Sequence, residues 1–300
     1  MDAKPLRLGF MGFGEAGYHF AKELSQAGLT GIVAYSRSGA RAAAGDPVRL
    51  RAAEAGVELV ATPRALCERA QLIIAVTPGR SALSALRSAR AHLAPQHIYV
   101  DASAASVAAM KQAEKLLEGG AGFVDAAIMG PVPIEGIRVL TLASGPCAAR
   151  FRELLAPYGM NIQVIEGAAG AASAMKLIRS VFMKGLAALL IETLEAAERQ
   201  GIREAVTSDV ARWLNDRPFE QVIQRFVCGT AVHAERRVHE MKDALELLRS
   251  LKSSSRMTRA TRAVIAAIAE MGLPARFAGR EPDSVVPVLQ AIVNSGAKLD

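Results

Sequence analysis

The sequence predicts an α/β fold in which an N-terminal doubly wound parallel sheet is followed by an all-helical region that a long helix introduces. Two observations lead to this prediction. In the first half, short β-rich runs alternate with helical stretches, as parallel strands joined by crossover helices do. After Gly170 the strand-like runs stop, and residues 171–200 form one helical stretch that only Gly185 interrupts. We therefore predict two domains, at residues 1–166 and 167–300.

The individual elements follow from the same pattern. Strands are expected at residues 7–11, 31–35, 72–76, 98–101, 123–126, 139–143 and 161–165. Two of these runs, LIIAV and IYVD, are almost continuously apolar, as strands buried on both faces of a sheet are. In the second half, helices are expected to break at Gly201, Arg217-Pro218, Gly229, 272–274 and 279–282, with a short turn at 252–255.

Composition limits the environment in which the chain works. The three cysteines are widely separated and form no CxxC pair, so neither disulfides nor a metal site is indicated, and we expect a reducing cytoplasm. The first strand starts by about Leu6, which leaves no room for a secretory signal. The most apolar stretch, 181–194, contains Lys184 and Glu192 and is shorter than the roughly 20 residues that cross a membrane, so we expect no membrane partner.

The net charge of +7 raises the question of nucleic-acid binding. The basic residues are interleaved with acids and have no aromatic partners for base stacking, so we expect no nucleic acid. Most of the excess charge fits a solvated surface, and an anionic cofactor and a small anionic substrate would exploit it through electrostatic steering. In the helical region, Arg249, Lys252, Arg256 and Arg259 recur at helical spacing, a pattern that is usually a solvated face.

A glycine-rich turn, Gly12-Phe13-Gly14-Glu15-Ala16-Gly17, follows the first strand and opens a helix. Here the glycines can form a tight turn, admit a pyrophosphate and let helix and strand pack closely. At the first strand of an alternating pattern, this motif predicts a dinucleotide-binding Rossmann domain. The plainer alternative is that the glycines only form a tight turn.

The residues after the second strand predict which dinucleotide binds. An NAD enzyme usually presents Asp or Glu there to the ribose hydroxyls. Here stand Ser36, Arg37 and Ser38, with Arg41 one helical turn further on. A guanidinium and hydroxyl groups suit a 2′-phosphate. We therefore expect NADP(H) rather than NAD.

Two further loops should reach the cofactor. Thr77 and Pro78 follow one strand and Ser103 follows the next, and open parallel sheets bind ligands at the carboxyl ends of their strands. Thr77 and Ser103 could approach the nicotinamide half of the cofactor. Helix N-capping is an equally good explanation of both side chains.

Lys176 is the most informative polar residue of the long helix, because the start of that helix is otherwise apolar and small. Arg179 and Ser180 share its face, whereas Lys184 lies about 80° further round. A lysine beside other cations in a cleft can be kept partly neutral, as acid-base catalysis near neutral pH requires. The default alternative is a surface lysine that extends into solvent.

The sequence resembles the β-hydroxyacid dehydrogenase superfamily over essentially the whole chain, and in particular a less characterised bacterial branch that is similar to 6-phosphogluconate and 3-hydroxyisobutyrate dehydrogenases. GFMGFGEAG resembles the family's GFIGLGxMG, and YSRS its Asn-Arg-Ser/Thr. DAAIMGP (125–131) stands where the family has DAPVSGG, the loop that holds the substrate carboxylate. GAASAMK (170–176) stands where the family has GxGxxxK, and MKDALEL (241–247) stands where it has KDLxLA. The resemblance implies that Lys176 is the catalytic acid and base and that Lys242 approaches the cofactor. It implies hydride transfer between nicotinamide and a small hydroxyacid or the corresponding semialdehyde or ketoacid.

Two departures from the family pattern both touch the substrate. Met129-Gly130-Pro131 replaces Ser-Gly-Gly, and Arg179-Ser180 replaces the asparagine after the lysine. Arg179 offers a bidentate fork that could bind the carboxylate instead, although a structural ion pair would explain it equally well. We expect the substrate to contact Ser103, Met129, Gly130, Pro131, Arg179 and Ser180.

Two other functions stay open. Relatives with the same layout reduce imines, usually without the lysine, so Lys176 disfavours that activity. A non-catalytic NADPH-binding protein on the same scaffold would suit the altered loop. The resemblance also implies a homodimer that pairs through its helical domains, in which His233 or Arg259 could reach the partner's cleft.

Overall fold

The computed structural model describes residues 5–37, 39, 42–43 and 45–296. These residues form two compact units that divide between Ser180 and Val181. Helix α8 (Ala171–Gln200) begins in the first unit and ends in the second, and its bounds agree with the helical stretch predicted from the sequence. The division between the units falls inside this helix, and the predicted domain boundary after residue 166 stays a prediction.

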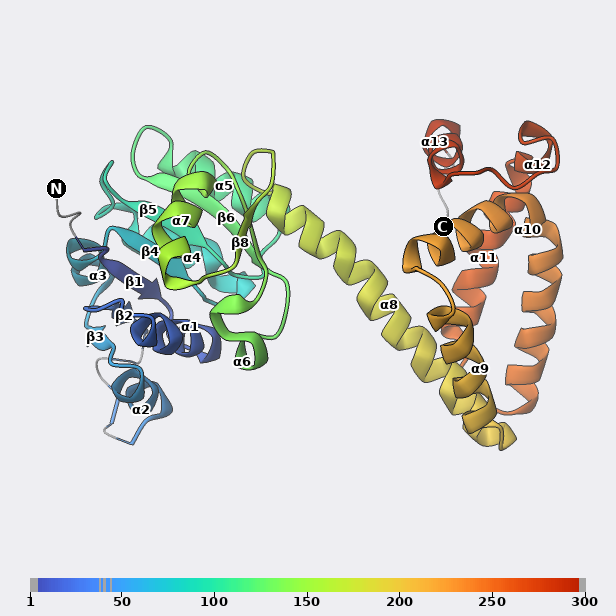
Figure 1. Cartoon of the computed structure of the whole chain (residues 1–300), viewed down its shortest axis with the longest axis horizontal. Coiled ribbons are helices and arrows are strands. Elements are labelled where there is room, and N and C mark those ends of the chain that lie inside the picture. Colours follow the sequence, from blue (N-terminus) through green and yellow to red (C-terminus); the bar gives the residue numbers. More distant parts are fainter. Residues whose placement is uncertain (1–4, 38, 40–41, 44, 297–300) are drawn as a thin grey trace. The chain divides into compact units, whose positions relative to one another are not determined.

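The first unit is built on one eight-stranded sheet with the order β3-β2-β1-β4-β5-β6-β7-β8 (Figure 1). The strands are β1 (Leu8–Met11), β2 (Val33–Tyr35), β3 (Glu58–Val60), β4 (Leu72–Ala75), β5 (Ile98–Asp101), β6 (Gly122–Ile128), β7 (Thr141–Ser144) and β8 (Ile162–Val164). The chain order reverses between the neighbours β1 and β4, which is where a doubly wound sheet opens its ligand crevice. The predicted fold class is thus confirmed.

Two features of the sheet differ from the prediction. β3 is an edge strand that the sequence pattern does not indicate, because it has only three residues and begins with the exposed Glu58. β7 pairs antiparallel with β6, and β8 runs parallel to β7, so the sheet is not parallel throughout. The connection from β6 to β7 holds only the short helices α6 (Val132–Glu135) and η3 (Gly136–Arg138), too little for the crossover that a parallel pair needs.

Helices cover both faces of the sheet, because each buries an apolar stripe against it. In α1, Phe20 and Leu24 are buried one turn apart, and in β1 the successive residues Phe10 and Met11 enter opposite cores. One face carries α1 (Glu15–Gln26), α2 (Pro47–Glu54), α6 and α7 (Ala148–Leu155). The other carries α3 (Pro63–Arg69), α4 (Ala82–Arg90) and α5 (Val107–Leu117). Short turns η2 (Gly79–Ser81) and η4 (Ala156–Tyr158) precede α4 and β8.

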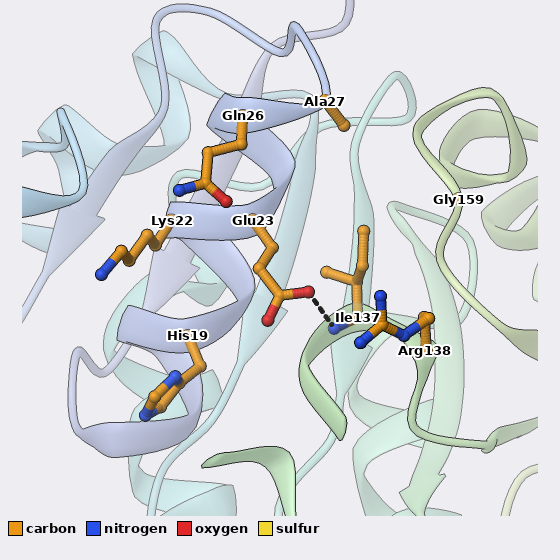
Figure 2. A pocket seen from close by; sticks show the side chains of 8 residues that line it. All are labelled: His19, Lys22, Glu23, Gln26, Ala27, Ile137, Arg138 and Gly159. Carbon is orange, nitrogen blue, oxygen red and sulfur yellow. Dashed lines mark hydrogen bonds between the residues drawn. The ribbon is translucent and has the colours of Figure 1, made fainter. Parts of the chain in front are cut away.

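Helix α1 is tied by one carboxylate to the segment that follows β6. The Glu23 side chain accepts a hydrogen bond from the Ile137 amide at 3.1 Å (Figure 2). Gly136 allows this approach, because its φ is +57° and a Cβ there would collide with the Glu23 carboxylate. Beside the bond lies a pocket of about 610 Å³ lined in part by Lys22 and Arg138. The chain after β6 is therefore anchored to the helix of the glycine-rich turn.

The described part of the second unit is helical, and none of the described helices is long and apolar enough to cross a membrane. After α8 come α9 (Arg203–Asn215), α10 (Phe219–Ser250), α11 (Arg256–Glu270), α12 (Leu273–Arg276) and α13 (Val285–Ser295). The predicted breaks at Gly201, Arg217-Pro218 and 279–282 lie between these helices, and the break at 272–274 is confined to Gly272, because α12 begins at Leu273. One break needs a correction. Gly229 is not a break, because α10 continues through it and bends instead at His233, where φ is −112° and ψ is 21°. Arg237 donates a hydrogen bond to the Thr230 hydroxyl and so bridges the bend.

A carboxylate of α8 caps the N-terminus of α11. Glu192 is buried and accepts hydrogen bonds from the amides of Met257 and Thr258 at 3.0 and 2.8 Å. The hydroxyls of Thr258 and Ser254 also donate to it, at 2.7 and 3.2 Å. Burial raises the pKa of Glu192, but these hydrogen bonds outweigh it and hold the pKa below its ordinary value. The first amides of α11, which have no partner inside the helix, find one in this side chain.

Candidate functional site

The glycine-rich turn joins β1 to α1 with the geometry that dinucleotide binding requires. Gly12 has a φ of +90°, and a Cβ there would stand 2.9 Å from the Thr77 methyl group. Gly14 is the N-cap residue of α1, makes no side-chain cap, and has open space where a Cβ would stand. A Cβ at Gly17 would come within 3.1 Å of Val76, so this glycine lets α1 pack closely on the end of β4. The helix end and the space at Gly14 together fit a pyrophosphate.

A pocket of about 590 Å³ extends from this turn to the residues after β2. Predicted cofactor residues in its lining are Gly12, Phe13, Gly14, Ser36, Arg37, Thr77 and Pro78. Two further charged side chains line it. Arg51 adds a second cation, and Asp46 accepts a hydrogen bond from the Val48 amide at 2.9 Å, which caps α2. Ser38 and Arg41 lie outside the described residues.

The loops after β4 and β5 pack against each other at the carboxyl edge of the sheet. A Cβ at Gly79 would collide with the Ala104 carbonyl oxygen. The hydroxyls of Thr77 and Ser103 are both buried and have no hydrogen-bond partner among the described residues. Helix capping does not explain them, because α5 is capped by Ser106 and neither Thr77 nor Ser103 bonds a helix amide. Unpartnered buried hydroxyls at this edge fit the polar atoms of a bound dinucleotide.

Two buried carboxyl groups stand side by side on β5 and β6. Asp101 and Asp125 are partners in the strand register, and both are fully buried. Asp101 Oδ1 accepts a hydrogen bond from the Ser103 amide at 2.9 Å, whereas Oδ2 has no partner among the described residues. Burial raises the pKa of Asp101, Ser103 lowers it, and Asp125 raises it further, so that the pKa lies above its ordinary value.

Asp125 fixes the beginning of α8. Its Oδ2 accepts hydrogen bonds from the amides of Gly170 and Ser173 at 2.9 and 3.0 Å, and its Oδ1 accepts one from the Ser173 hydroxyl at 2.6 Å. Ser144, its register partner on β7, donates to Oδ2 at 3.2 Å and accepts from the Ala172 amide at 3.1 Å. The first amides of a helix have no partner within it. Here two strands of the sheet supply their partners, and α8 starts from a buried polar anchor.

Lys176 lies on the helix face that continues from this anchor. It stands three residues after Ser173, which contacts Asp125 in β6, and three before Arg179, which donates to the Met129 carbonyl oxygen at 2.9 Å. Residues three apart share a helix face, so the face that bears Lys176 is directed to the carboxyl end of β6. Lys176 is half-buried. Arg179 is exposed and forms no ion pair with a described acid of the first unit.

The predicted substrate loop lies between β6 and α6. Met129 donates its amide hydrogen to the Leu140 carbonyl oxygen at 2.8 Å, and Pro131 is the N-cap residue of α6. The Glu135 carboxylate covers Gly130, because a Cβ at Gly130 would collide with Glu135 Oε1. The loop that we expect to face the substrate therefore carries an acidic side chain of the protein itself.

The remaining predicted residues lie along the helices. Ser180 is half-buried on α8, at the end of the first unit. In the second unit, Lys184 and Lys242 are exposed, and His233 Nε2 lies 3.5 Å from Glu281 Oε1. The approach of Lys242 to the cofactor and of His233 to a cleft stays a prediction.

Three residues of the site are absent from the sequence-based selection: Arg51, Asp125 and Glu135. A signal exists for Arg51, because Asp46-Pro47 is typical of a helix start and places Arg51 in the second turn. Asp125 meets Gly170 across 45 residues of sequence. Neither this contact nor the position of Glu135 over Gly130 can be predicted from neighbouring residues in the sequence.

A doubly wound sheet that carries this glycine turn where the strand order reverses between β1 and β4, followed by a separate helical unit, defines a dinucleotide-binding protein. Residues 7–165 match the family described as the NAD binding domain of 6-phosphogluconate dehydrogenase, and the chain belongs to this family. Residues 197–268 match a domain of unknown function (DUF1932).

Solved structures agree with this assignment. A conserved hypothetical protein from Sinorhizobium meliloti is 31% identical, with a TM-score of 0.62 over 88% of this chain and 89% of that one. A conserved protein of unknown function, described as structurally similar to 3-hydroxyacid dehydrogenases, is 32% identical, with a TM-score of 0.60 over 92% of this chain and 100% of that one. An imine reductase from Aspergillus terreus, solved in complex with NADPH4, is 18% identical and shares the fold, with a TM-score of 0.74 over 90% and 95% of the two chains. This chain is an NAD(P)-binding dehydrogenase or reductase with a hydroxyacid dehydrogenase-like fold.

Proposed function

We propose that this protein is an NADP(H)-dependent oxidoreductase that transfers hydride between the nicotinamide and a small hydroxyacid or the corresponding semialdehyde or ketoacid, with Lys176 as general acid and base. The position of Lys176 carries this proposal. It lies between Ser173 and Arg179, whose contacts with β6 and its loop direct this helix face to the carboxyl end of the sheet. Ligands of doubly wound sheets bind at that end.

This proposal assigns a role to each of the main residues of the site. The nicotinamide, when bound, accepts or supplies the hydride. Lys176 takes the proton of the substrate hydroxyl in oxidation and returns one to the carbonyl oxygen in reduction. Arg179 uses one N–H group on the Met129 carbonyl oxygen and has further donors for the substrate carboxylate. Thr77, whose hydroxyl lacks a partner among the described residues, hydrogen-bonds to the cofactor. Ser103, whose hydroxyl also lacks one, hydrogen-bonds to the substrate beside the nicotinamide.

The preference for NADP(H) rests on the charges in the dinucleotide pocket. Arg37 and Arg51 both line it, and the acid that shares the pocket, Asp46, is engaged in capping α2. In Arg37→Ala, the affinity for NADPH should fall about tenfold while that for NADH stays unchanged. Arg64→Ala, which changes an exposed arginine on α3, is the matched control. An unchanged ratio of the two affinities would refute the preference.

The role of Lys176 is tested by turnover measured together with cofactor affinity. Lys176→Ala should lower kcat/KM by about 10²–10⁴-fold and leave the Kd for NADPH unchanged. Lys184→Ala removes an exposed lysine of the same helix and should leave both quantities unchanged. Full turnover in Lys176→Ala would overturn the proposal. Tight NADPH binding without turnover of any hydroxyacid, semialdehyde or imine would favour a non-catalytic binding protein.

One observation favours imine reduction as a second candidate. Glu135 places a carboxylate over Gly130, where the family resemblance leads us to expect a substrate carboxylate, and like charges repel whereas a cationic iminium would be attracted. The imine reductase from Aspergillus terreus shares this fold. Glu135→Gln distinguishes the candidates. It should raise kcat/KM for hydroxyacids if they are the substrates, and lower it for cyclic imines if imines are.

We also propose that the chain forms a homodimer through α8. This helix exposes large apolar side chains on both sides of the unit boundary, including Ile178 at 72%, Val181 at 75% and Ile191 at 71% exposure. A second copy would remove them from water. Sedimentation of Val181→Asp/Ile191→Asp should show a monomer where the native protein shows a dimer, whereas Lys184→Asp should stay dimeric. A native monomer would refute the proposal.

A further inference from the structure

Four cationic side chains gather in one pocket of the second unit. The pocket has a volume of about 510 Å³ and lies where α10 turns into α11. Arg249 and Lys252 reach it from the end of α10, and Arg259 and Arg262 from α11. None of these four cations takes part in an ion pair with another described residue. The pocket is therefore strongly positive.

Two carboxylates of α8 approach the connection from α10 to α11, and both are engaged in hydrogen bonds. Glu192 uses both oxygens to cap α11. Glu195 accepts hydrogen bonds from Ser253, which lines the pocket, and from Arg199. The N-terminal amides of α11 are therefore already bound, and recognition in the pocket falls to its side chains. Because Arg259 and Arg262 are like charges three residues apart on one helix, they destabilise that helix unless a counter-charge is present.

Lys252 adds a backbone cost to this arrangement. Its φ is +54°, in the left-handed region, at the residue that follows the C-cap Leu251. Helices commonly end there with a glycine, and the bond from the Ser253 amide to the Leu248 carbonyl oxygen at 3.0 Å completes that motif. A lysine at this position is disfavoured relative to glycine. Residues held in such backbone conformations cluster at ligand clamps, and this one carries a cation into the pocket.

We propose that this pocket binds a small phosphate-bearing anion. Guanidinium groups match the geometry of phosphate oxygens in bidentate fashion, and Ser255, another residue of the lining, has a hydroxyl that can donate a hydrogen bond. All of its residues belong to the second unit, and none of them lines the dinucleotide pocket. The site therefore does not depend on the proposed hydride transfer. Inorganic phosphate and the phosphate group of an organic ester share the required chemistry.

Titration calorimetry of the full chain with pyrophosphate at low ionic strength tests the site. Arg259→Ala/Arg262→Ala should bind pyrophosphate about tenfold more weakly than the native protein. Arg256→Ala removes an exposed cation of the same helix that does not line the pocket, and should leave the affinity unchanged. Affinity that falls in Arg37→Ala and not in the double variant would place the pyrophosphate in the dinucleotide pocket and overturn the proposal. The proposal would also be overturned if a mixed-sequence oligonucleotide bound more weakly to the double variant while pyrophosphate bound to it as to the native protein.

Lys252→Gly separates binding from folding. It relieves the left-handed backbone and should raise the midpoint of thermal unfolding, measured by the fluorescence of Trp213 in the same unit. It also removes one cation and should weaken pyrophosphate binding several-fold. A variant that is more stable and binds more weakly supports a ligand site. A variant that binds pyrophosphate as the native protein does would contradict it.

Discussion

Replacement of Asp125 removes the anchor of α8. In Asp125→Ala the buried amides of Gly170 and Ser173 lose their acceptor. Each unsatisfied buried amide costs about 1–3 kcal/mol, so the first unit should lose roughly 2–6 kcal/mol of unfolding free energy. Domains have only about 5–15 kcal/mol in total, so this variant is expected near the limit of folding. Asp125→Asn keeps one oxygen for the amides and loses the charge, and should cost about 1–2 kcal/mol.

The assay must report on the first unit. The chain has one tryptophan, Trp213, and it lies on α9 of the second unit. We therefore propose guanidinium unfolding followed by circular dichroism and compared with Trp213 fluorescence, so that the change absent from the fluorescence belongs to the first unit, together with amide hydrogen exchange of the peptide 168–178. In Asp125→Asn that peptide should exchange faster, while a peptide from α11 keeps its rate. Turnover should fall mainly through kcat, because Lys176 loses its position whereas the cofactor pocket does not change.

Ser173→Ala is the graded control. It removes the 2.6 Å hydrogen bond to Asp125 Oδ1 and leaves the two amide bonds to Oδ2 in place, so its cost should be about 1 kcal/mol. Asp125 is not the anchor of α8 if Asp125→Asn changes the unfolding free energy by less than about 0.5 kcal/mol, the usual range of surface substitutions, and leaves the exchange of 168–178 unaltered.

Three further predictions concern titratable groups. The folded-state pKa of Asp101 is raised, so its protonated form contributes stability at low pH that is lost as the pH rises through that pKa. Asp101→Asn should therefore stabilise the protein at neutral pH and not below about pH 4. Unfolding curves at several pH values would show this difference. The folded-state pKa of Glu192 is lowered, so its contribution to stability is present above its ordinary pKa and is lost as the pH falls through the folded-state pKa. Glu192→Gln should therefore destabilise the second unit, which contains Trp213, at pH 7. The difference in unfolding free energy between this variant and the native protein should vanish in strong acid. Burial raises the pKa of both the Cys67 thiol, to about 11, and the Cys147 thiol, but only Cys147 is partly exposed. A thiol reagent at pH 8 should therefore label Cys147 first, and equal labelling of the native protein would contradict this.

The sequence allowed much of the fold to be predicted, because its signals there are local. Gly12, Gly14 and Gly17 follow an apolar strand, and the bounds of α8 follow from a helical pattern that only Gly185 interrupts. The reversed direction of β7 and β8 could not be predicted from local patterns, since the direction of a strand depends on the path of the connection that follows β6. The predicted break at Gly229 was wrong because a glycine is tolerated inside a long helix, and α10 bends at His233 instead.

The candidate site was predicted less completely than the fold. Sequence patterns select Lys176 and Arg179 as residues, but not the contacts that orient them, because Asp125 and Met129 lie some 50 positions away in sequence. The unpartnered hydroxyls of Thr77 and Ser103 are equally invisible in a sequence, where capping explains them just as well.

The two carboxylates that bracket α8 have a consequence for how the chain loses its structure. Asp125 holds the first turn of this helix from the sheet, and Glu192, further along the same helix, holds the first turn of α11. The Asp125 carboxylate protects the amides of Gly170 and Ser173, and the Glu192 carboxylate protects those of Met257 and Thr258. Loss of one anchor should leave amide exchange at the other unchanged, so the first turns of α8 and of α11 should open to solvent independently.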